Sequence, residues 1–373
     1  MNPIVFPNYE NSILNVSNSI LKHYGAKTWH PTIKLLDDVL AKNYRNVILL
    51  LVDGLGVDAI AKHLPTTSNL RKYLQTTITS VFPSTTVAAT TAVLSGKTPI
   101  ETGWFGWHQY IKEEDESIIL FLNKAYYNPD KNYEYNIASK FIPYTNLYNQ
   151  IESANSHVKT DEVFPAFRTP ENNTIAKLLG AAKEATKPSG LHFVYAYWDK
   201  VDTYMHEFGP SSNEVRDHIL EVEAAFTDFV NNLEDDTVLI TIADHGQVDV
   251  EIIDLYQYKD VIDTLLRMPS NESRATVFYV KPDRYDDFEK IFNQYFKSYF
   301  NLYRSEEAIA MGIFGSGIKH QRTIGFLGDY IAIATDYFIF NTIDDGFRMK
   351  GQHAGLLKEE MLVPLIIATK KSL

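Results

Sequence analysis

The sequence predicts an α/β protein built on a doubly wound, mostly parallel sheet. Three apolar segments, "RNVILLLVD", "LHFVYAYWD" and "DTVLITIAD", lack the alternation of a half-exposed strand and are typical of strands buried on both faces. Helical patterns such as "NEVRDHILEVEAAFTDFVNNL" lie between them, as in a parallel sheet with crossover helices. Each of the three strands ends at an acidic residue. Because such sheets bind ligands beyond the carboxyl ends of their strands, we expect these acids to share one edge.

Composition narrows the possible functions. The chain has 373 residues, 45% of them apolar, which allows a sizeable core. A formal net charge of -12 argues against electrostatic binding of nucleic acid or of a membrane surface. With no cysteine, disulfides, thiolate zinc sites and cysteine nucleophiles are excluded. The N-terminal segment lacks the pattern of a signal peptide and no apolar run is long enough to span a bilayer, so we expect a cytoplasmic protein.

Two regions fit the sheet less well. Residues 105–175 are rich in Tyr, Asn and Lys, and we expect loops or a small excursion over the site there. Residues 270–335 show the order strand, helix, strand, helix, which favours a small inserted α+β cap. The catalytic core would then comprise residues 1–269 and 336–373.

A set of carboxylates and imidazoles suggests metal chemistry. Hydrolysis of a phosphate ester needs an activated oxygen nucleophile and a neutralised transition state, and two divalent metals about 4 Å apart supply both. Taken singly, each residue also has a structural reading, as a helix cap, a solvated acid–histidine pair, a structural turn or a surface histidine. The candidate ligands are Asp53, Asp202, His206, Asp244, His245 and His353.

The segment "SVFPSTTVAATTAVLSGKTP" supplies candidate nucleophiles. A hydroxyl group where its Ala-rich helix begins would meet free backbone N–H groups and the positive end of the helix dipole, which suit a phosphate. An ordinary Ser/Thr helix cap is the structural alternative. Thr85 and Thr86 both stand at this position.

The order of the motifs "VDGLG", "FPSTTVAATTAVLSGKTPIETG", "DTYMHEFGP", "ADHG" and "GQHAG" resembles the alkaline phosphatase superfamily, and within it the nucleotide pyrophosphatase/phosphodiesterase branch. The resemblance implies a three-layer α/β/α sandwich with a small inserted cap. It also implies that Asp53, Asp244, His245 and a threonine hold one metal. Asp202, His206 and His353 would hold the other. Counting back from Gly96 to the family's nucleophile position selects Thr86, with Thr85 as the fallback.

The sequence departs from the family beside the site. Phosphodiesterase members usually carry an asparagine shortly after a His-Gly pair, and that asparagine binds a phosphate oxygen. Here "ETGWFGWHQ" has Thr102 in place of the histidine and Trp107 about where the asparagine would fall. Trp104, Phe105 and Trp107 could stack on a flat group of the substrate or pack under a loop. Trp107 is our candidate substrate-binding residue.

We therefore expect a metal-dependent phosphodiesterase or nucleotide pyrophosphatase acting on a small phosphodiester or nucleotide-like substrate. Two divalent ions are implied; zinc is favoured because half of the six ligands are imidazoles, and manganese is also compatible. A phosphomonoesterase or phosphomutase would use the same ligands with an extra cation, for which Arg168 or Lys97 is available. A non-catalytic metal-binding protein is the alternative from another class.

Overall fold

The computed structural model describes residues 3–346 and 348–370 and contains a six-stranded central sheet with strand order β2-β17-β8-β1-β7-β6. Strand β1 pairs in parallel with β7 on one side and with β8 on the other, and β6 continues the parallel set beyond β7. Strand β17 runs antiparallel to both of its neighbours, β2 and β8. The bounds are β1 Asn46–Val52, β2 Leu74–Thr79, β6 Val158–Val163, β7 Leu191–Trp198, β8 Thr237–Ile242 and β17 Leu362–Thr369. The predicted α/β fold with a mostly parallel central sheet is confirmed.

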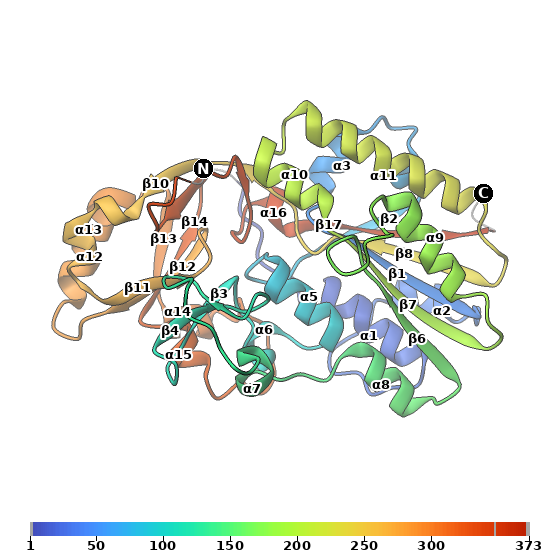
Figure 1. Cartoon of the computed structure of the whole chain (residues 1–373), viewed down its shortest axis with the longest axis horizontal. Coiled ribbons are helices and arrows are strands. Elements are labelled where there is room, and N and C mark those ends of the chain that lie inside the picture. The colour runs from blue at the N-terminus through green and yellow to red at the C-terminus, as the bar shows by residue number, and fades with distance from the viewer. Residues whose placement is uncertain (1–2, 347, 371–373) are drawn as a thin grey trace.

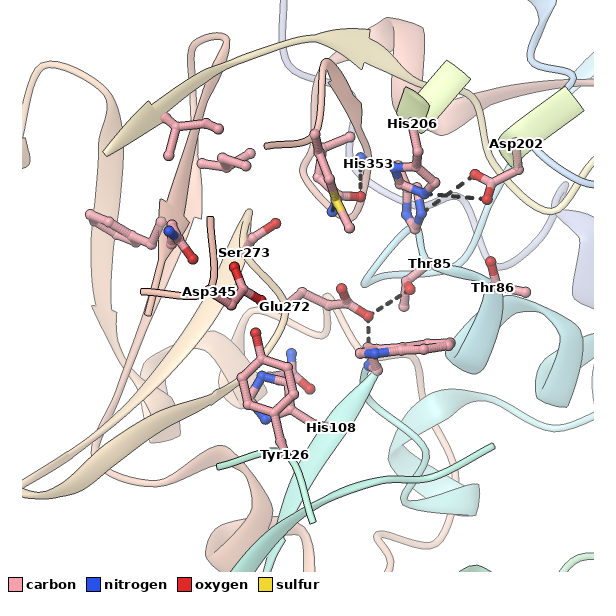
Figure 2. Close-up of a pocket in the computed structure, with 18 residues that line it drawn as sticks. Thr85, Thr86, His108, Tyr126, Asp202, His206, Glu272, Ser273, Asp345 and His353 are labelled. Carbon is pink, nitrogen blue, oxygen red and sulfur yellow. Dashed lines mark hydrogen bonds and ion pairs between the residues drawn. The ribbon is translucent and has the colours of Figure 1, made fainter. Parts of the chain in front are cut away.

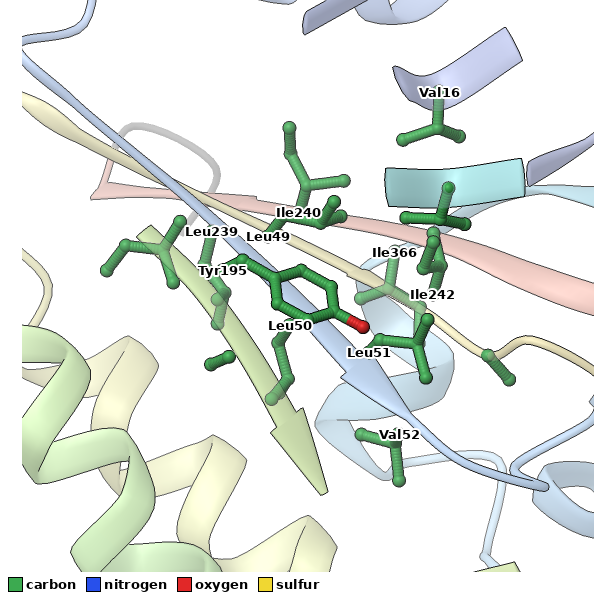
Figure 3. Close-up of a cluster of buried hydrophobic side chains, with 14 of the residues drawn as sticks. Val16, Leu49, Leu50, Leu51, Val52, Tyr195, Leu239, Ile240, Ile242 and Ile366 are labelled. Atoms are coloured by element: carbon green, nitrogen blue, oxygen red, sulfur yellow. The ribbon is translucent and has the colours of Figure 1, made fainter. Parts of the chain in front are cut away.

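Helices cover both faces of the central sheet (Figure 1). Helices α3 (Val57–His63), α9 (Ile175–Ala185), α10 (Lys200–Phe208) and α11 (Asn213–Asn231) lie on one face, and α1 (Ile13–His23), α5 (Thr86–Ser95) and α8 (Leu147–Ala154) lie on the other. Every residue of β1 is buried, because strands flank it and helices cover it. Figure 3 shows Leu49, Leu50 and Leu51 of β1 among Tyr195, Ile240 and Ile366 of neighbouring strands. This packing explains why the strand reads as one apolar run.

A second, seven-stranded sheet has the order β13-β14-β12-β11-β3-β4-β5, and its neighbouring strands pair antiparallel. It has its own core, in which Phe288, Phe292 and Phe296 of α13 (Tyr285–Phe296) pack near Phe278. Its strands are β3 His108–Ile111, β4 Glu116–Ile119, β5 Lys124–Ala125, β11 Leu265–Asn271, β12 Ala275–Val280, β13 Phe300–Arg304 and β14 Tyr330–Ala334.

Residues 105–175, expected to be loops, therefore contribute β3, β4 and β5 to the same sheet as the strands of 270–335, and they also contribute β6 to the central sheet. These strands are short, and β3 is buried at all four positions, so neither length nor alternation marks them in the sequence. The proposed domain boundaries remain a prediction. The second sheet itself is assembled from two separate parts of the chain.

The remaining elements are short or connect the two sheets. They are α2 Lys34–Leu40, α4 Asn69–Lys72, α6 Pro99–Thr102, α7 Ile137–Phe141, β9 Val248–Asp249, β10 Glu251–Asp254, η1 Leu255–Gln257, α12 Lys259–Ile262, α14 Ser305–Ala310, α15 Thr323–Leu327, β15 Phe338–Asn341, β16 Gly351–Gln352 and α16 Lys358–Met361. Within residues 3–346 and 348–370, none of the helices combines the length and the apolar character needed to cross a membrane.

Candidate active site

The six candidate ligands converge at the carboxyl edge of the central sheet. Asp53 follows β1, Asp244 follows β8, and Asp202 lies on α10 directly after β7, so the parallel strands bring them together. Two groups form, and in each group the ligand atoms lie within 4.8 Å of one another. The rings of His245 and His353, one from each group, stack with centroids 3.7 Å apart, so the groups adjoin. The first group is Asp53, Asp244 and His245, and the second is Asp202, His206 and His353.

In the first group each carboxylate has one oxygen held by the protein and one that is not. Asp53 Oδ2 accepts a hydrogen bond from the Tyr197 hydroxyl, and Asp244 Oδ1 accepts from the backbone N–H groups of Gly54 (3.1 Å) and His245 (3.0 Å). The other oxygens, Asp53 Oδ1 and Asp244 Oδ2, are buried without a hydrogen-bond donor from the described residues. His245 Nε2 lies 3.4 Å and 3.5 Å from them. Two buried, undonated oxygens beside an imidazole nitrogen fit a divalent cation.

The electrostatics of the first group point the same way. Burial, together with the nearby charges of Asp244 and Asp202, raises the pKa of Asp53 well above its usual range. Burial also raises the pKa of Asp244. Two carboxylates buried side by side repel each other unless a cation or a proton lies between them. A bound metal ion would remove that repulsion.

The second group combines one helix face with one loop. Asp202 and His206 are four residues apart on α10, with Asp202 Oδ2 3.2 Å from His206 Nε2, and His353 Nε2 is 3.6 Å from Asp202 Oδ1. Although burial opposes it, the charges of His206 and His353 hold the pKa of Asp202 below its usual range. Burial, followed by the charge of His245, keeps the pKa of His353 well below its usual range. An ionised carboxylate beside a neutral imidazole is a suitable pair of metal ligands.

All three histidines are oriented by backbone carbonyl groups. The Nδ1 atoms of His206, His245 and His353 lie 2.9, 3.1 and 3.0 Å from the carbonyl oxygens of Gly351, Gly246 and Ser84. With Nδ1–H donating to a carbonyl, the neutral ring presents the Nε2 lone pair to the site, as a metal-binding histidine does. A solvated histidine would not need this bond, so the surface-loop reading of His353, which is 5% exposed, is wrong.

The two threonines point to different partners. Thr86, the first residue of α5, places its Oγ1 3.2 Å from His245 Nε2 and 3.5 Å from Asp53 Oδ2. Thr85 Oγ1 instead donates to Glu272 Oε1 at 2.6 Å and makes no cap bond to the helix. The helix start therefore keeps N–H groups that no side chain caps, beside the Thr86 hydroxyl.

A pocket of about 370 Å³ opens next to the two groups. Figure 2 shows Thr85, Thr86, Asp202, His206 and His353 on its inner side. We call the opposite side the far wall; it consists of Trp107, His108, Tyr126, Glu272 and Asp345. Trp104 and Phe105 are instead buried in the core of the second sheet. Of the three aromatic residues considered for stacking, Trp107 is the one that lines the pocket.

Sequence reasoning missed Glu272. It lies in the turn between β11 and β12, is 7% exposed, and accepts hydrogen bonds from Thr85 Oγ1 and from the Trp107 backbone N–H, both at 2.6 Å. Asn271 before it has a left-handed backbone (φ 84°), which is uncommon outside glycine and often marks functional turns. In the sequence, "PSNESR" looks like an ordinary polar turn, so the segment itself carries no signal of burial.

The site combines two groups of carboxylates and imidazoles at the carboxyl edge of a mostly parallel sheet with a hydroxyl group at a helix start. This combination is typical of metal-dependent hydrolases of phosphoric esters. The chain belongs to the type I phosphodiesterase / nucleotide pyrophosphatase family, whose sequence model matches residues 47–353. No curated protein sequence matched the chain. The resemblance predicted from the motifs is confirmed, and the protein is a phosphoric ester hydrolase.

Solved structures share the fold. Murine ectonucleotide pyrophosphatase / phosphodiesterase 5 superposes with a TM-score of 0.66 at 17% identity, over 86% of this chain and 87% of that chain. An inactive threonine-to-alanine variant of that protein in complex with AMP superposes with a TM-score of 0.66 at 16% sequence identity. The match covers 87% of this chain and 88% of that chain. Phosphonoacetate hydrolase from Sinorhizobium meliloti 1021, in complex with phosphonoformate, superposes with a TM-score of 0.62 at 14% sequence identity. The match covers 88% of this chain and 91% of that chain.

Proposed function

We propose that the protein is a phosphodiesterase or nucleotide pyrophosphatase that uses Thr86 as nucleophile and two divalent metal ions. The observation that carries the proposal is the position of the Thr86 hydroxyl, which lies 3.2 Å from His245 Nε2 in the first group while the second group adjoins it. The inactive threonine variant of the murine phosphodiesterase supports a threonine in this role. Its complex with AMP supports a nucleotide-like or other small phosphodiester substrate.

Each residue of the site then has a task. Asp53, Asp244 and His245 would hold one ion, and the second group would hold the other. When bound, the two ions neutralise charge on the attacking and leaving oxygens. Thr86 Oγ1 forms a bond to phosphorus while the ester bond to the leaving group breaks, and a water molecule then cleaves the phosphothreonine. The uncapped N–H groups at the start of α5 would hold a non-bridging oxygen.

Zinc is the metal we propose, because three of the six ligand side chains are imidazoles that turn Nε2 to the site. Manganese is the alternative, since it also accepts nitrogen and oxygen ligands. Titration of metal-free protein with each ion, monitored through hydrolysis, would decide between them. Full recovery with manganese and none with zinc would contradict the assignment.

A diester is favoured over a monoester because none of the described residues brings an extra cation into the pocket. Arg168 pairs with Glu162 at 2.9 Å and Lys97 stacks 3.9 Å above the Trp29 ring. Neither lines the pocket, and none of the described residues that do is a lysine or an arginine. The dianionic terminal phosphate of a monoester would have only the metals to neutralise it.

The deciding experiment compares hydrolysis of a nitrophenyl phosphodiester with that of the matching monoester, with added zinc or manganese. Thr86→Ala should lower kcat by about three orders of magnitude or more, because it removes the nucleophile. Thr85→Ala is the matched control and should keep most of the activity. Loss of activity in Thr85→Ala with most of the activity kept in Thr86→Ala would assign the role of nucleophile to Thr85.

Two further outcomes would reassign the protein. Preference for the monoester would place it among phosphatases with the same metal site. Metal binding without turnover of either ester, together with unfolding when the metal is removed, would favour a non-catalytic metal-binding protein.

A further inference from the structure

The carboxylates of the first group share one arrangement. In both Asp53 and Asp244, one oxygen accepts a hydrogen bond from outside the ligand side chains, and the other oxygen is left without a donor from the described residues. A carboxylate held by one oxygen presents the other to a metal ion in a fixed direction. The same arrangement at Asp202, the carboxylate of the second group, requires a donor of its own.

Gln247 supplies that donor. Its Nε2 donates to Asp202 Oδ1, and to the Asp202 backbone carbonyl oxygen at 3.3 Å. Because both partners are acceptors, the atom that faces them is the amide nitrogen and not the amide oxygen. The residue is 5% exposed, and its Oε1 is buried without a donor from the described residues. Both hydrogen bonds that the side chain makes within the described part of the chain therefore go to Asp202.

This contact leaves the other carboxylate oxygen of Asp202 for an ion. Asp202 Oδ2 lies 3.2 Å from His206 Nε2, and Figure 2 shows the rings of His206 and His353 beside the carboxylate. Since the Nδ1 of each ring faces a backbone carbonyl, Nε2 of the neutral ring carries a lone pair. A lone pair and a carboxylate oxygen at this distance fit a cation between them.

The position of Gln247 in the chain links the two groups. It follows His245 of the first group by two residues, and Val248 directly after it pairs with Gln352 where β9 meets β16. That pairing brings the loop with His353 against the turn after β8. One short segment therefore carries a ligand of the first group and the donor that holds a ligand of the second.

An uncharged donor suits this position. A lysine or an arginine could also donate to Asp202, but its positive charge would repel a divalent ion bound at the same carboxylate. An amide fixes the carboxylate and leaves its negative charge to the ion. The residue type, and not only its place, therefore fits a role in metal binding.

We infer that Gln247 is a positioning residue for the second metal ion, which acts by fixing Asp202 and not by contact with the ion. The inference rests on the proposed function, because it requires that Asp202, His206 and His353 bind an ion. Gln247 then sets the affinity for that ion, and with it the metal concentration at which the enzyme becomes active.

The first test measures zinc binding to metal-free protein by competition with a chromophoric chelator. Gln247→Met keeps the length of the side chain and removes the donor, so the dissociation constant of the second zinc should rise about 10- to 100-fold. The first zinc should bind as in the parent. Asp202→Asn removes a ligand of the second group and so identifies the binding step that belongs to it. Gln247→Leu also lacks the donor, which keeps the test valid if the methionine variant misfolds.

Two further measurements separate positioning from a general loosening of the fold. The zinc concentration for half-maximal hydrolysis should rise with the dissociation constant, while kcat at saturating zinc recovers most of the parent's value. The visible absorption of bound cobalt, which depends on the geometry around the ion, should change for the second ion only. The matched control is Gln150→Met, which removes an amide of α8 that bonds Trp29 and Ser95 and should change none of these values.

The outcomes separate this inference from the proposed function. Two bound zinc ions in the parent, with an unchanged second dissociation constant in both Gln247 variants, would overturn the inference alone. A lower kcat at saturating zinc with unchanged zinc binding would also overturn it, since Gln247 would then not act through metal binding. Failure of the parent to bind a second ion would overturn the two-metal proposal together with the inference.

Discussion

The two sides of the pocket differ in how their side chains are held. On the inner side the metal-ligand candidates stand at strand ends and on one helix, and each histidine is fixed by a backbone carbonyl. On the far wall the side chains come from a turn and from short strands or loops of the second sheet. Fixed ligands suit metal chemistry, and turns and loops often carry the residues that select a substrate. From this comparison we expect the proposed reaction and its substrate selectivity to depend on different parts of the chain.

Two of the contacts between these parts of the described chain involve segments that carry site residues. One is the hydrogen bond from Thr85 to Glu272. The other is the fully buried ion pair between Arg274, the residue directly before β12, and Glu360, with N–O distances of 2.7 and 2.9 Å. Glu360 also accepts from the Gly355 N–H at 2.7 Å and so holds the loop that carries His353. A change at the ion pair should therefore affect both sides.

The largest expected effect is the loss of all hydrolysis in Asp53→Asn, for every ester alike, because we propose that the inner side performs the reaction. Metal-free Asp53→Asn should nevertheless melt at the same temperature as the metal-free parent or higher, because the substitution removes repulsion from Asp244 and Asp202. Activity assays and thermal melts with a chelator measure the two effects. Activity close to the parent's would contradict the metal-ligand role of Asp53.

The next effect concerns stability. Arg274→Met should lower the free energy of unfolding by about 3–5 kcal/mol, because it leaves the buried Glu360 charge unpaired. Adding Glu360→Gln removes that charge while keeping acceptors for the loop, and should recover part of the loss. Arg284→Met breaks an exposed pair with Asp287 and should cost less than about 1 kcal/mol. Denaturant unfolding of the three variants checks the order; equal losses for Arg274 and Arg284 would contradict a structural role for the buried pair.

The difference between the inner side and the far wall also explains which site residues the sequence can predict. Strands such as β1 are marked by an unbroken apolar run, and the ligands are marked by motifs placed directly after such strands. Glu272 has no such mark, because its burial depends on packing of a turn against α5 from a distant part of the chain. Strand β3 pairs with β11 through His108 and Asn271, which lie far apart in the sequence, and the four residues of β3 show no apolar period. Long-range pairing of short, irregular segments is not encoded locally.

The smallest expected effect is a change in substrate preference with pH. Burial raises the pKa of Glu272 to about 7, so its carboxyl group is mostly neutral below that pH and mostly ionised above it. The ratio of kcat/KM for a nitrophenyl phosphodiester with an uncharged second ester group to that for the same ester carrying an added carboxylate should therefore be several-fold larger at about pH 8 than at about pH 6, because the ionised Glu272 repels the added charge. Taking the ratio of two esters cancels the effects of pH on metal binding and on the nucleophile, which both substrates share. In Glu272→Gln the ratio should not vary with pH; a pH dependence that persists in this variant would assign it to another group and not to Glu272.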